Sequence, residues 1–362
     1  MREINVAIVG CGFVANGHIR AWRKVREARV EAVCDLNETT AKSTAELWKI
    51  PHYYKSSSEL MEHGNIDLVD ICTPPQTHAS LADQAMKAGF HVLLEKPMTM
   101  TVKDAERIVE CQKTTGMKAG VIHNWLFDPP VLEADSFVKR GFLGEVINVE
   151  VEAIATKYNS MASDEHHWCH SLPGGRFSEM LAHPIYLIRH FLGEVEVGDV
   201  HVSKIGEYAW MKSDEFYATF KVGDKLGRAY ASFNAPRDAI FVNLYGREAI
   251  LKLEVINATA NLLPRRKSSR FNKGFDSLRQ ATQLMKSTAK NAAKITFGRR
   301  LSGHEMYINL FAQSLIGGYE PPVTVEDGYV VVKTLEEVCR RIEMAEKKAS
   351  EPTYSSESKS IG

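Results

Sequence analysis

The chain has 362 residues, with 45 Lys and Arg balanced by 45 Asp and Glu, and 44% of its residues are hydrophobic. This length and composition predict a globular protein of about two domains and exclude a single small binding module. A net charge of zero disfavours a nucleic-acid-binding protein. There is no signal-peptide pattern and no apolar stretch long enough to cross a membrane, so we expect a soluble cytoplasmic protein. Six scattered cysteines predict neither a disulfide framework nor a zinc ribbon.

Residues 1–123 alternate short apolar runs with amphipathic helical patterns. The first apolar runs begin at Ile4, Val30 and Ile66, and each is followed by apolar residues at helical spacing. Strands that are apolar almost throughout, alternating with helices, predict a parallel sheet covered on both faces. We therefore expect residues 1–123 to form a doubly wound, Rossmann-type domain that binds a nucleotide cofactor.

From residue 124 the pattern changes to strands in which polar and apolar residues alternate. Short turns with Gly, Asp or Asn join these strands, which predicts a mostly antiparallel open sheet. A helix after Gly174–Gly175 interrupts the strands, and a final helix is expected over 325–348. We expect residues 124–350 to form an α+β domain and the polar residues 351–362 to be a disordered tail.

A glycine-rich turn follows the first apolar run. The segment Gly10–Ala15 matches GxGxxA between a strand and a helix, where backbone can approach a pyrophosphate at the helix N-terminus. Asp35 ends the second strand, where a carboxylate accepts the ribose hydroxyls and repels a 2′-phosphate. These features predict NAD, with NADP less favoured; a helix N-cap is the alternative role for Asp35. The residues of the turn expected to bind the cofactor are Gly10, Gly12, Phe13 and Val14.

Three further stretches occur with this turn: Thr73-Pro74 followed by His78, Glu95-Lys96-Pro97 at the end of a buried strand, and the helix after Gly174–Gly175. With these motifs the sequence resembles the glucose-fructose oxidoreductase, inositol dehydrogenase and MocA (Gfo/Idh/MocA) family over essentially the whole chain. The resemblance implies an NAD(P)-dependent enzyme that transfers a hydride between nicotinamide and a secondary hydroxyl or ketone of a sugar, nucleotide sugar or cyclitol. It also implies a homo-oligomer, a dimer or tetramer, with residues 124–350 binding substrate and forming the subunit contacts.

The resemblance also implies roles for individual residues. Lys96 would orient the substrate hydroxyl and relay charge. In the family the helix after the glycines carries an aspartate and, four residues later, a histidine; here Glu179 and His183 stand at these positions. His183 is the expected general base, and Glu179, one methylene longer than the family aspartate, would orient it together with Lys96. Further cofactor contacts are expected from Thr73, Pro74, His78, Glu95 and Lys96.

Substrate contacts are expected from three places in the second domain. Asn124 and Trp125 lie in a stretch where relatives often carry arginine, so the substrate preference should differ from theirs. Trp168 and His170 belong to a His-rich segment, 166–170, whose composition suits a metal site. The family is metal-independent and the sequence has no HExxH helix, so we expect these two residues to line the substrate cleft and predict no metal. Tyr186, on the helix of His183, is the last expected substrate contact.

Residues 264–300 form a basic insertion that the resemblance does not explain. They include eleven basic residues and one acid, Asp276, whereas the rest of the chain has 34 basic and 44 acidic residues. At helical spacing, basic and apolar residues fall on opposite faces. Such a helix could bind an anionic membrane surface, the diphosphate of a nucleotide sugar or an acidic neighbouring subunit, or it could pack on its own sheet with a solvated charged face. The basic residues are Arg265, Arg266, Lys267, Arg270, Lys273, Arg279, Lys286, Lys290, Lys294, Arg299 and Arg300.

A protein of the same fold that binds a dinucleotide without turnover, as a regulator or scaffold, is the alternative function. The presence of both Lys96 and His183 argues against it, because a protein without chemistry has no need of either side chain.

Overall fold

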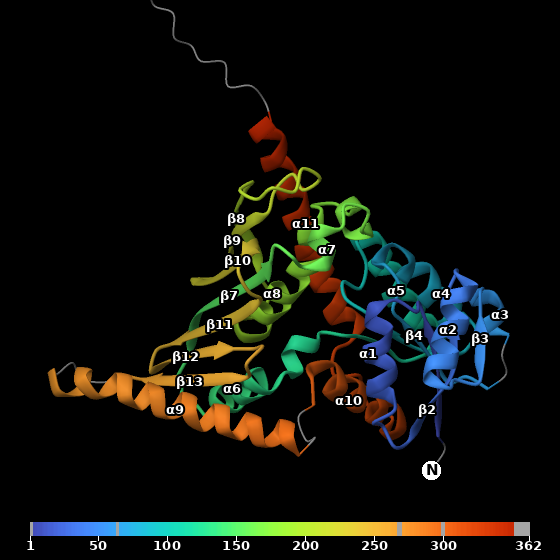
Figure 1. Cartoon of the computed structure of the whole chain (residues 1–362), viewed down its shortest axis with the longest axis horizontal. Coiled ribbons are helices and arrows are strands. Elements are labelled where there is room, and N and C mark those ends of the chain that lie inside the picture. The colour runs from blue at the N-terminus through green and yellow to red at the C-terminus, as the bar shows by residue number, and fades with distance from the viewer. Residues whose placement is uncertain (1–2, 63–64, 266–269, 298–300, 351–362) are drawn as a thin grey trace, which may run out of the picture.

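The computed structural model of the chain describes residues 3–62, 65–265, 270–297 and 301–350. Two sheets with their helices lie side by side, one formed by the N-terminal third of the chain and the other by the middle of the chain (Figure 1). The predicted tail, 351–362, lies outside the described residues, as do four basic residues of the insertion, Arg266, Lys267, Arg299 and Arg300.

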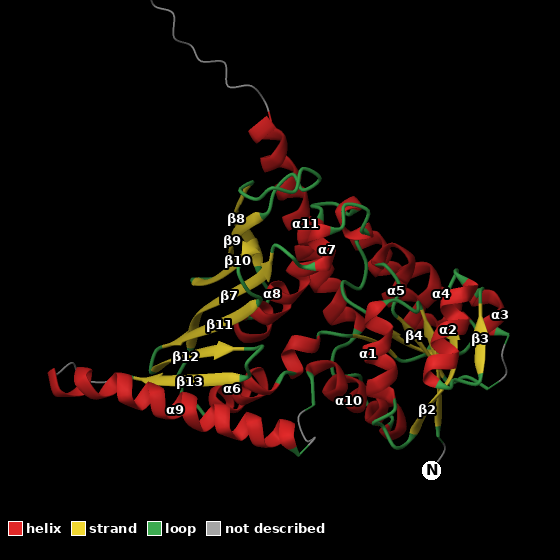
Figure 2. Ribbon diagram, in the orientation of Figure 1, coloured by secondary structure: helices red, strands yellow, loops and turns green. Residues whose placement is uncertain are grey.

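The N-terminal sheet has six parallel strands in the order β3-β2-β1-β4-β5-β6. Its central strands are buried almost throughout, which explains their nearly continuous apolar sequences. Helices connect successive strands and cover the sheet (Figure 2). The strands are β1 (Ile4–Val9), β2 (Ala28–Cys34), β3 (His52–Tyr54), β4 (Leu68–Ile71), β5 (His91–Leu94) and β6 (Ala119–Val121), and the helices are α1 (Phe13–Trp22), α2 (Glu38–Trp48), α3 (Ser57–Met61), α4 (His78–Lys87) and α5 (Val102–Thr115).

The second sheet has seven strands in the order β13-β12-β11-β7-β10-β9-β8. All neighbours are antiparallel except β7 and β10, which pair in parallel at the centre. The long helix α8 packs against these two central strands. The strands are β7 (Val146–Thr156), β8 (Glu196–Ser203), β9 (Glu215–Val222), β10 (Lys225–Ala235), β11 (Ala239–Gly246), β12 (Ala249–Glu254) and β13 (Thr259–Pro264), and the helices are α6 (Pro129–Lys139), α7 (Ser160–Ser163), α8 (Arg176–Leu192), α9 (Arg270–Thr296), α10 (Gly303–Gly317) and α11 (Val325–Ser350). Together the two sheets confirm the predicted fold class.

The C-terminal helices return to the N-terminal sheet. Tyr307 and Phe311 of α10 are fully buried in the same core as the parallel strands, and α10 packs along α1. The approach is so close that a Cβ on Gly120 of β6 would lie 2.7 Å from the Phe311 ring and 2.8 Å from the Tyr307 hydroxyl. A glycine is therefore required in β6 for α10 to dock. Helix α11 continues this seam by packing against both α5 and α8.

Within the described residues, none of the helices combines the length and the apolar composition needed to cross a membrane.

Candidate active site

A cavity of about 510 Å³ lies at the carboxyl ends of the parallel strands and extends to α8. In open α/β sheets this edge is where ligands bind. A larger cavity of about 1000 Å³ lies between α11 and β8, away from the glycine turn. The first cavity brings together most of the predicted cofactor residues and two predicted catalytic ones: its lining includes Gly10, Gly12, Phe13, Val14, Asp35, Thr73, Pro74, Glu95, Lys96, Trp168 and Glu179.

The glycine turn forms one end of this cavity. Gly10 has φ of +92°, and a Cβ there would lie 2.9 Å from the backbone carbonyl of Cys72, so only glycine fits. Asp35 accepts hydrogen bonds from the N–H groups of Cys11, at 2.8 Å, and Asn37, at 2.9 Å. The N-cap of α2 is Asn37, whose side chain accepts from Thr40 N–H. The alternative N-cap role for Asp35 is therefore wrong, and Asp35 itself lines the cavity.

The residues present at this end fit a dinucleotide. Phe13 and Leu36, on either side of Asp35 in the cavity lining, are 94% and 93% exposed, which is unusual for large apolar side chains. A nucleotide bound between the glycine turn and Asp35 would cover both of them. Helix α1 begins directly at this turn, and its positive N-terminal end favours a pyrophosphate.

Lys96 lies at the opposite end of the cavity, just after β5 and next to the cis peptide bond that precedes Pro97. Its ammonium group donates to the backbone oxygen of Glu179 at 3.1 Å and forms an ion pair with the Glu179 carboxylate. The other carboxylate oxygen of Glu179 pairs with Arg176, which is buried with only 5% of its surface exposed. Burial alone would raise the pKa of Glu179, but the two cations hold that pKa below its usual range.

Sequence reasoning missed Arg176, although its position three residues before Glu179 on a helix is a signal for an ion pair. Gly174 and Gly175 set the position of this arginine. Both have positive φ, of +73° and +60°, and a Cβ on Gly174 would lie 3.1 Å from the Cys339 sulfur. The two glycines let the chain turn tightly against α11, so α8 begins at Arg176 with its first turn facing Lys96.

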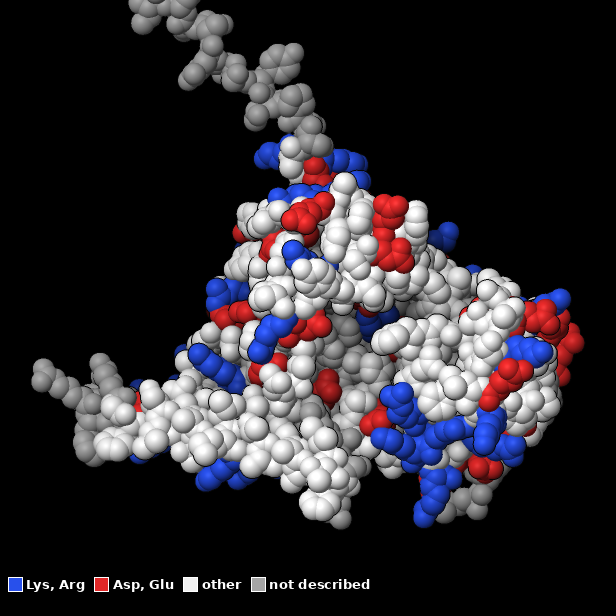
Figure 3. All heavy atoms as spheres, in the orientation of Figure 1, with Lys and Arg blue, Asp and Glu red and all other residues white. Residues whose placement is uncertain are grey.

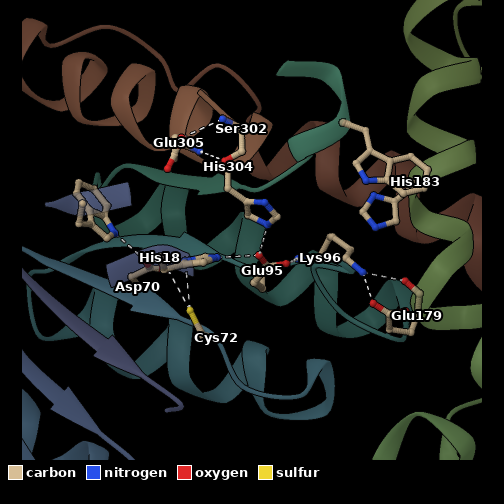
Figure 4. A network of polar contacts seen from close by, with 12 residues as sticks. His18, Asp70, Cys72, Glu95, Lys96, Glu179, His183, Ser302, His304 and Glu305 are labelled. Atoms are coloured by element: carbon tan, nitrogen blue, oxygen red, sulfur yellow. Dashed lines mark hydrogen bonds and ion pairs between the residues drawn. The ribbon is translucent and has the colours of Figure 1, made fainter. Parts of the chain in front are cut away.

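His183 lies one turn further along α8 and is buried among aromatic rings. Its Nδ1 is 2.7 Å from the Tyr186 hydroxyl, whose oxygen accepts a hydrogen bond from Trp125 N–H at 2.9 Å. The Trp125 ring stacks on the imidazole, with centroids 3.9 Å apart and planes 9° from parallel. Burial, followed by the Lys96 charge, lowers the pKa of His183 well below its ordinary value. The imidazole is therefore neutral at pH 7, and its ring lies beside the Lys96 side chain (Figure 4).

A second polar network lies on the other side of Glu95. The Nε2 atom of His18 is 2.8 Å from Glu95 Oε1, and its Nδ1 is 2.8 Å from Asp70 Oδ2. Trp22 donates to the same Asp70 oxygen, and His304 of α10 reaches Glu95 at 3.2 Å (Figure 4). Burial opposes a charge on His18, but Asp70 and its other partners raise the pKa of His18 well above its ordinary value.

The donor atoms of this network include two groups that could hold a metal ion, His18 with Asp70 and Cys72, and His18 with Glu95 and His304. Ligand atoms about 2.1 Å from a tetrahedral ion lie about 3.4 Å apart. The contacts of 2.8 Å around His18 are shorter and are those of charge-assisted hydrogen bonds between an imidazolium and two carboxylates.

The other predicted site residues are placed as follows. His78 is fully buried with its ring nitrogens 2.8 Å and 3.0 Å from the backbone oxygens of Thr73 and Met98, so it supports the cofactor loop from behind. Trp168 lines the main cavity, whereas His170 lines a separate small cavity together with Arg176. Asn124 is buried, and its Oδ1 has no hydrogen-bond partner among the described residues.

This fold and the residues at the strand ends are those of a dinucleotide-binding protein. Residues 4–123 match the family described as the oxidoreductase family with an NAD-binding Rossmann fold, GFO_IDH_MocA. This match covers the N-terminal third of the chain, agrees with the resemblance over that part, and names NAD as the cofactor of the matched domain.

Similar proteins support this assignment. The chain is 28% identical over 144 residues to D-apiose dehydrogenase of Paraburkholderia graminis, covering 40% of this chain and 38% of that protein. It is 25% identical over 197 residues to myo-inositol 2-dehydrogenase of Thermotoga maritima, covering 54% and 57%. These segments are less than two thirds of the length of either relative. Among solved structures, the WlbA dehydrogenase of Bordetella pertussis in complex with NADH and UDP-GlcNAcA has the same fold, with a TM-score of 0.79 and 19% identity, covering 95% of this chain and 96% of that chain.

Proposed function

We propose that the protein is an NAD-dependent oxidoreductase that transfers a hydride between nicotinamide and a secondary hydroxyl or ketone of a sugar, nucleotide sugar or cyclitol. One observation carries the proposal: Lys96, with its partner Glu179, lies in the same cavity as the glycine turn and Asp35. A cofactor held at the turn would extend toward the lysine, so the reacting carbon of a substrate would lie next to a cation and a buried imidazole.

Some residues of the site bind the cofactor, and others contact the substrate oxygen or take part in proton transfer. Asp35 and the glycine turn hold NAD, which supplies the hydride acceptor or donor when bound. Lys96 donates a hydrogen bond to the substrate oxygen and stabilises the negative charge that develops there. Glu179 and Arg176 act on Lys96, because they fix the direction of its ammonium group.

His183 exchanges the proton of the substrate hydroxyl at Nε2. During oxidation its Nδ1–H donates to the Tyr186 oxygen, which has a second lone pair for Trp125 N–H. The lowered pKa keeps the imidazole neutral and able to accept a proton at neutral pH. Stacking by Trp125 keeps the ring in one plane, so Nε2 has a fixed direction.

Several relatives support the substrate class. D-apiose dehydrogenase and myo-inositol 2-dehydrogenase are named for a sugar and a cyclitol, and the WlbA dehydrogenase was solved with UDP-GlcNAcA. In this chain the aromatic ring of Trp168 lines the cavity with polar neighbours His167 and Glu179. An aromatic face with hydrogen-bonding groups around it suits the apolar face and the hydroxyls of a sugar ring.

Nicotinamide absorbance tests the proposal. The protein is mixed with NAD and, one at a time, with aldoses, nucleotide sugars and inositols, and the reverse reaction is followed with NADH and the matching ketones. We expect absorbance to change with at least one compound. If NAD binds, as measured by quenching of protein fluorescence, and no compound changes its redox state, the non-catalytic alternative replaces this proposal.

We further propose a cytoplasmic homo-oligomer. All six cysteines are free, as expected in a reducing compartment. Tyr217 and Leu226, on neighbouring strands of the seven-stranded sheet, lie on the same face and are 36% and 45% exposed, which leaves apolar area for another subunit to cover. Light scattering coupled to gel filtration measures the mass; a monomer at micromolar concentration would contradict the proposal.

A further inference from the structure

Helix α9 (Arg270–Thr296), in the basic insertion, packs with its polar side toward the protein. Gln283 donates to the backbone oxygen of Leu262 at 3.0 Å and accepts from the Leu262 N–H at 2.9 Å. Asn291 and Ser287 donate to the backbone oxygen of Ala258. Gln283 thus satisfies both backbone groups of Leu262 in β13, the edge strand of its sheet, and the other two side chains bond to the residue just before that strand.

Because the polar side faces the sheet, the apolar side of α9 faces solvent. Leu278 is 60% exposed, Met285 72% and Ile295 57%, and the adjoining Phe297 is 73% exposed. This is the reverse of the packing expected for a helix that simply covers its own sheet. Helix α9 does pack on its own sheet with exposed charges, as one of the alternatives from the sequence has it, but its apolar side is exposed as well.

A row of cations borders this apolar surface. Arg279, Lys286 and Lys290 are exposed and fall within about 40° of one another at 100° per residue, next to the apolar strip. Among the described residues of α9 the only acid is Asp276. Figure 3 shows a long uncharged strip along α9 with basic side chains at its lower edge. At about 1.5 Å per residue the helix is about 40 Å long, so the strip is long as well as continuous.

We propose that the outer face of α9 docks the protein onto an anionic lipid surface. Exposed Leu, Met, Ile and Phe side chains would enter the boundary between headgroups and acyl chains, and the bordering cations would meet anionic headgroups. A second copy of α9 is a poorer partner, because pairing the two apolar strips would bring two rows of cations together with a single acid on each helix.

Co-sedimentation of the full-length protein with vesicles tests this inference. One set of vesicles is pure phosphatidylcholine and the other contains about one third phosphatidylglycerol. We expect binding to the anionic vesicles only, and a loss of most binding in about 0.5 M NaCl because salt screens the charges. No binding to anionic vesicles at low salt overturns the proposal.

Two variants separate the apolar from the electrostatic contribution. Met285→Glu should abolish binding, whereas Met344→Glu, on α11 and 56% exposed, is the matched control and should bind as the wild type does. Lys286→Gln with Lys290→Gln should weaken binding about thirtyfold, because each cation near an anionic surface contributes about a factor of five. The control for the charges is Lys42→Gln with Lys103→Gln, two exposed lysines on α2 and α5.

Circular dichroism and NAD binding show that each variant is folded. If Met285→Glu binds vesicles as well as the wild type does, the outer face of α9 is not the docking surface. If the same variant instead lowers the oligomer mass in sedimentation velocity without vesicles, a second copy covers this face, and the lipid proposal is overturned. Neither result affects the proposed activity, because none of the α9 side chains that the structure describes lines the cavity that holds Lys96.

Discussion

His18 and His183 lie on opposite sides of the dipeptide Glu95-Lys96, and the protein keeps them in opposite charge states. His18 lies between the carboxylates of Asp70 and Glu95, and Asp70 is the main group that raises its pKa against the effect of burial, so it is an imidazolium. His183 is buried between aromatic rings, and burial and then the Lys96 ammonium lower its pKa, so it is neutral. Both side chains are buried, and burial lowers the pKa of each, but only at His18 do neighbouring negative charges outweigh that effect.

Because their charge states differ, His18 and His183 have separate roles. A charged histidine with both nitrogens occupied cannot take a proton from a substrate, and it holds β4, β5 and α1 together. A neutral histidine can take a proton. The neighbours Glu95 and Lys96 point in opposite directions from the same strand end, and each completes one of the two networks (Figure 4).

Lys96→Ala should have the largest effect on turnover. We expect kcat to fall by about 10³-fold, the size of a lost proton-transfer or electrostatic contribution, with the dissociation constant of NAD changed less than about threefold. Stopped-flow absorbance and fluorescence quenching measure the two quantities. Lys103→Ala, an exposed lysine of α5, is the control. If kcat of Lys96→Ala stays within about twofold of the wild type, Lys96 has no catalytic role.

Replacing each histidine by asparagine should separate stability from turnover. His18→Asn leaves two buried carboxylates without their cation, so we expect the free energy of unfolding to fall by about 3 kcal/mol. His183→Asn should cost about 1 kcal/mol or less but lower kcat by about 10²-fold. Urea unfolding and steady-state rates measure the two effects. The comparison fails if both variants lose stability equally and His183→Asn keeps normal turnover.

Tyr186→Phe should have a smaller effect on the same chemistry. The variant removes the hydrogen-bond partner of His183 Nδ1 and leaves the Trp125 N–H without its acceptor. We expect kcat to fall about tenfold and the acidic limb of the kcat profile to move, whereas a purely structural role for Tyr186 would leave the shape of the pH profile unchanged.

The titration of both histidines should make the free energy of unfolding depend on pH. These are the smallest effects that we expect. His183 has a folded pKa below the unfolded value of about 6.5, so its contribution is present above that pH and is lost as the pH falls. His123, with a pKa lowered to about 3 by burial, acts in the same direction. His18 has a raised folded pKa, so its contribution is present below about 6.5 and is lost as the pH rises toward that folded pKa.

On both the acidic and the alkaline side, the free energy of unfolding should change by at most about 1.4 kcal/mol per pH unit for each histidine. Thermal unfolding from pH 4.5 to 9 measures the profile. His18→Asn should flatten the decline above about pH 6.5 and leave the acidic decline in place. A steeper alkaline decline in His18→Asn would show that the charge state assigned to His18 is wrong.

The sequence predicts the glycine turn, Asp35, Lys96 and Glu179 because each follows a recognisable strand or glycine pair, and the parallel sheet brings strand ends to one edge. The His18 network could not be predicted in the same way. His18, Asp70 and Glu95 are 77 residues apart at most, and their pairing depends on the register between α1 and two strands, which no local pattern specifies. His304 comes from a helix that crosses from the other end of the chain.

The orientation of α9 could not be predicted from the sequence either. A helical pattern gives the angular separation of basic, apolar and polar residues but not which side is turned inward. The orientation depends on the edge strand β13 and the residue before it: Gln283 bonds to Leu262 of the strand, and Ser287 and Asn291 bond to the Ala258 oxygen. An edge strand without another strand beside it needs hydrogen bonds more than apolar contacts.

The docking of α10 into the N-terminal core has a consequence for how the chain folds during synthesis. The strands of residues 4–121 are complete long before Tyr307 and Phe311 leave the ribosome, and until then the pocket above Gly120 is open. A fragment ending at residue 123 would therefore expose apolar surface and aggregate readily. Synthesis of about 180 further residues takes place at about 5–20 residues per second. During this time the apolar surface of the nascent N-terminal sheet is open to chaperones.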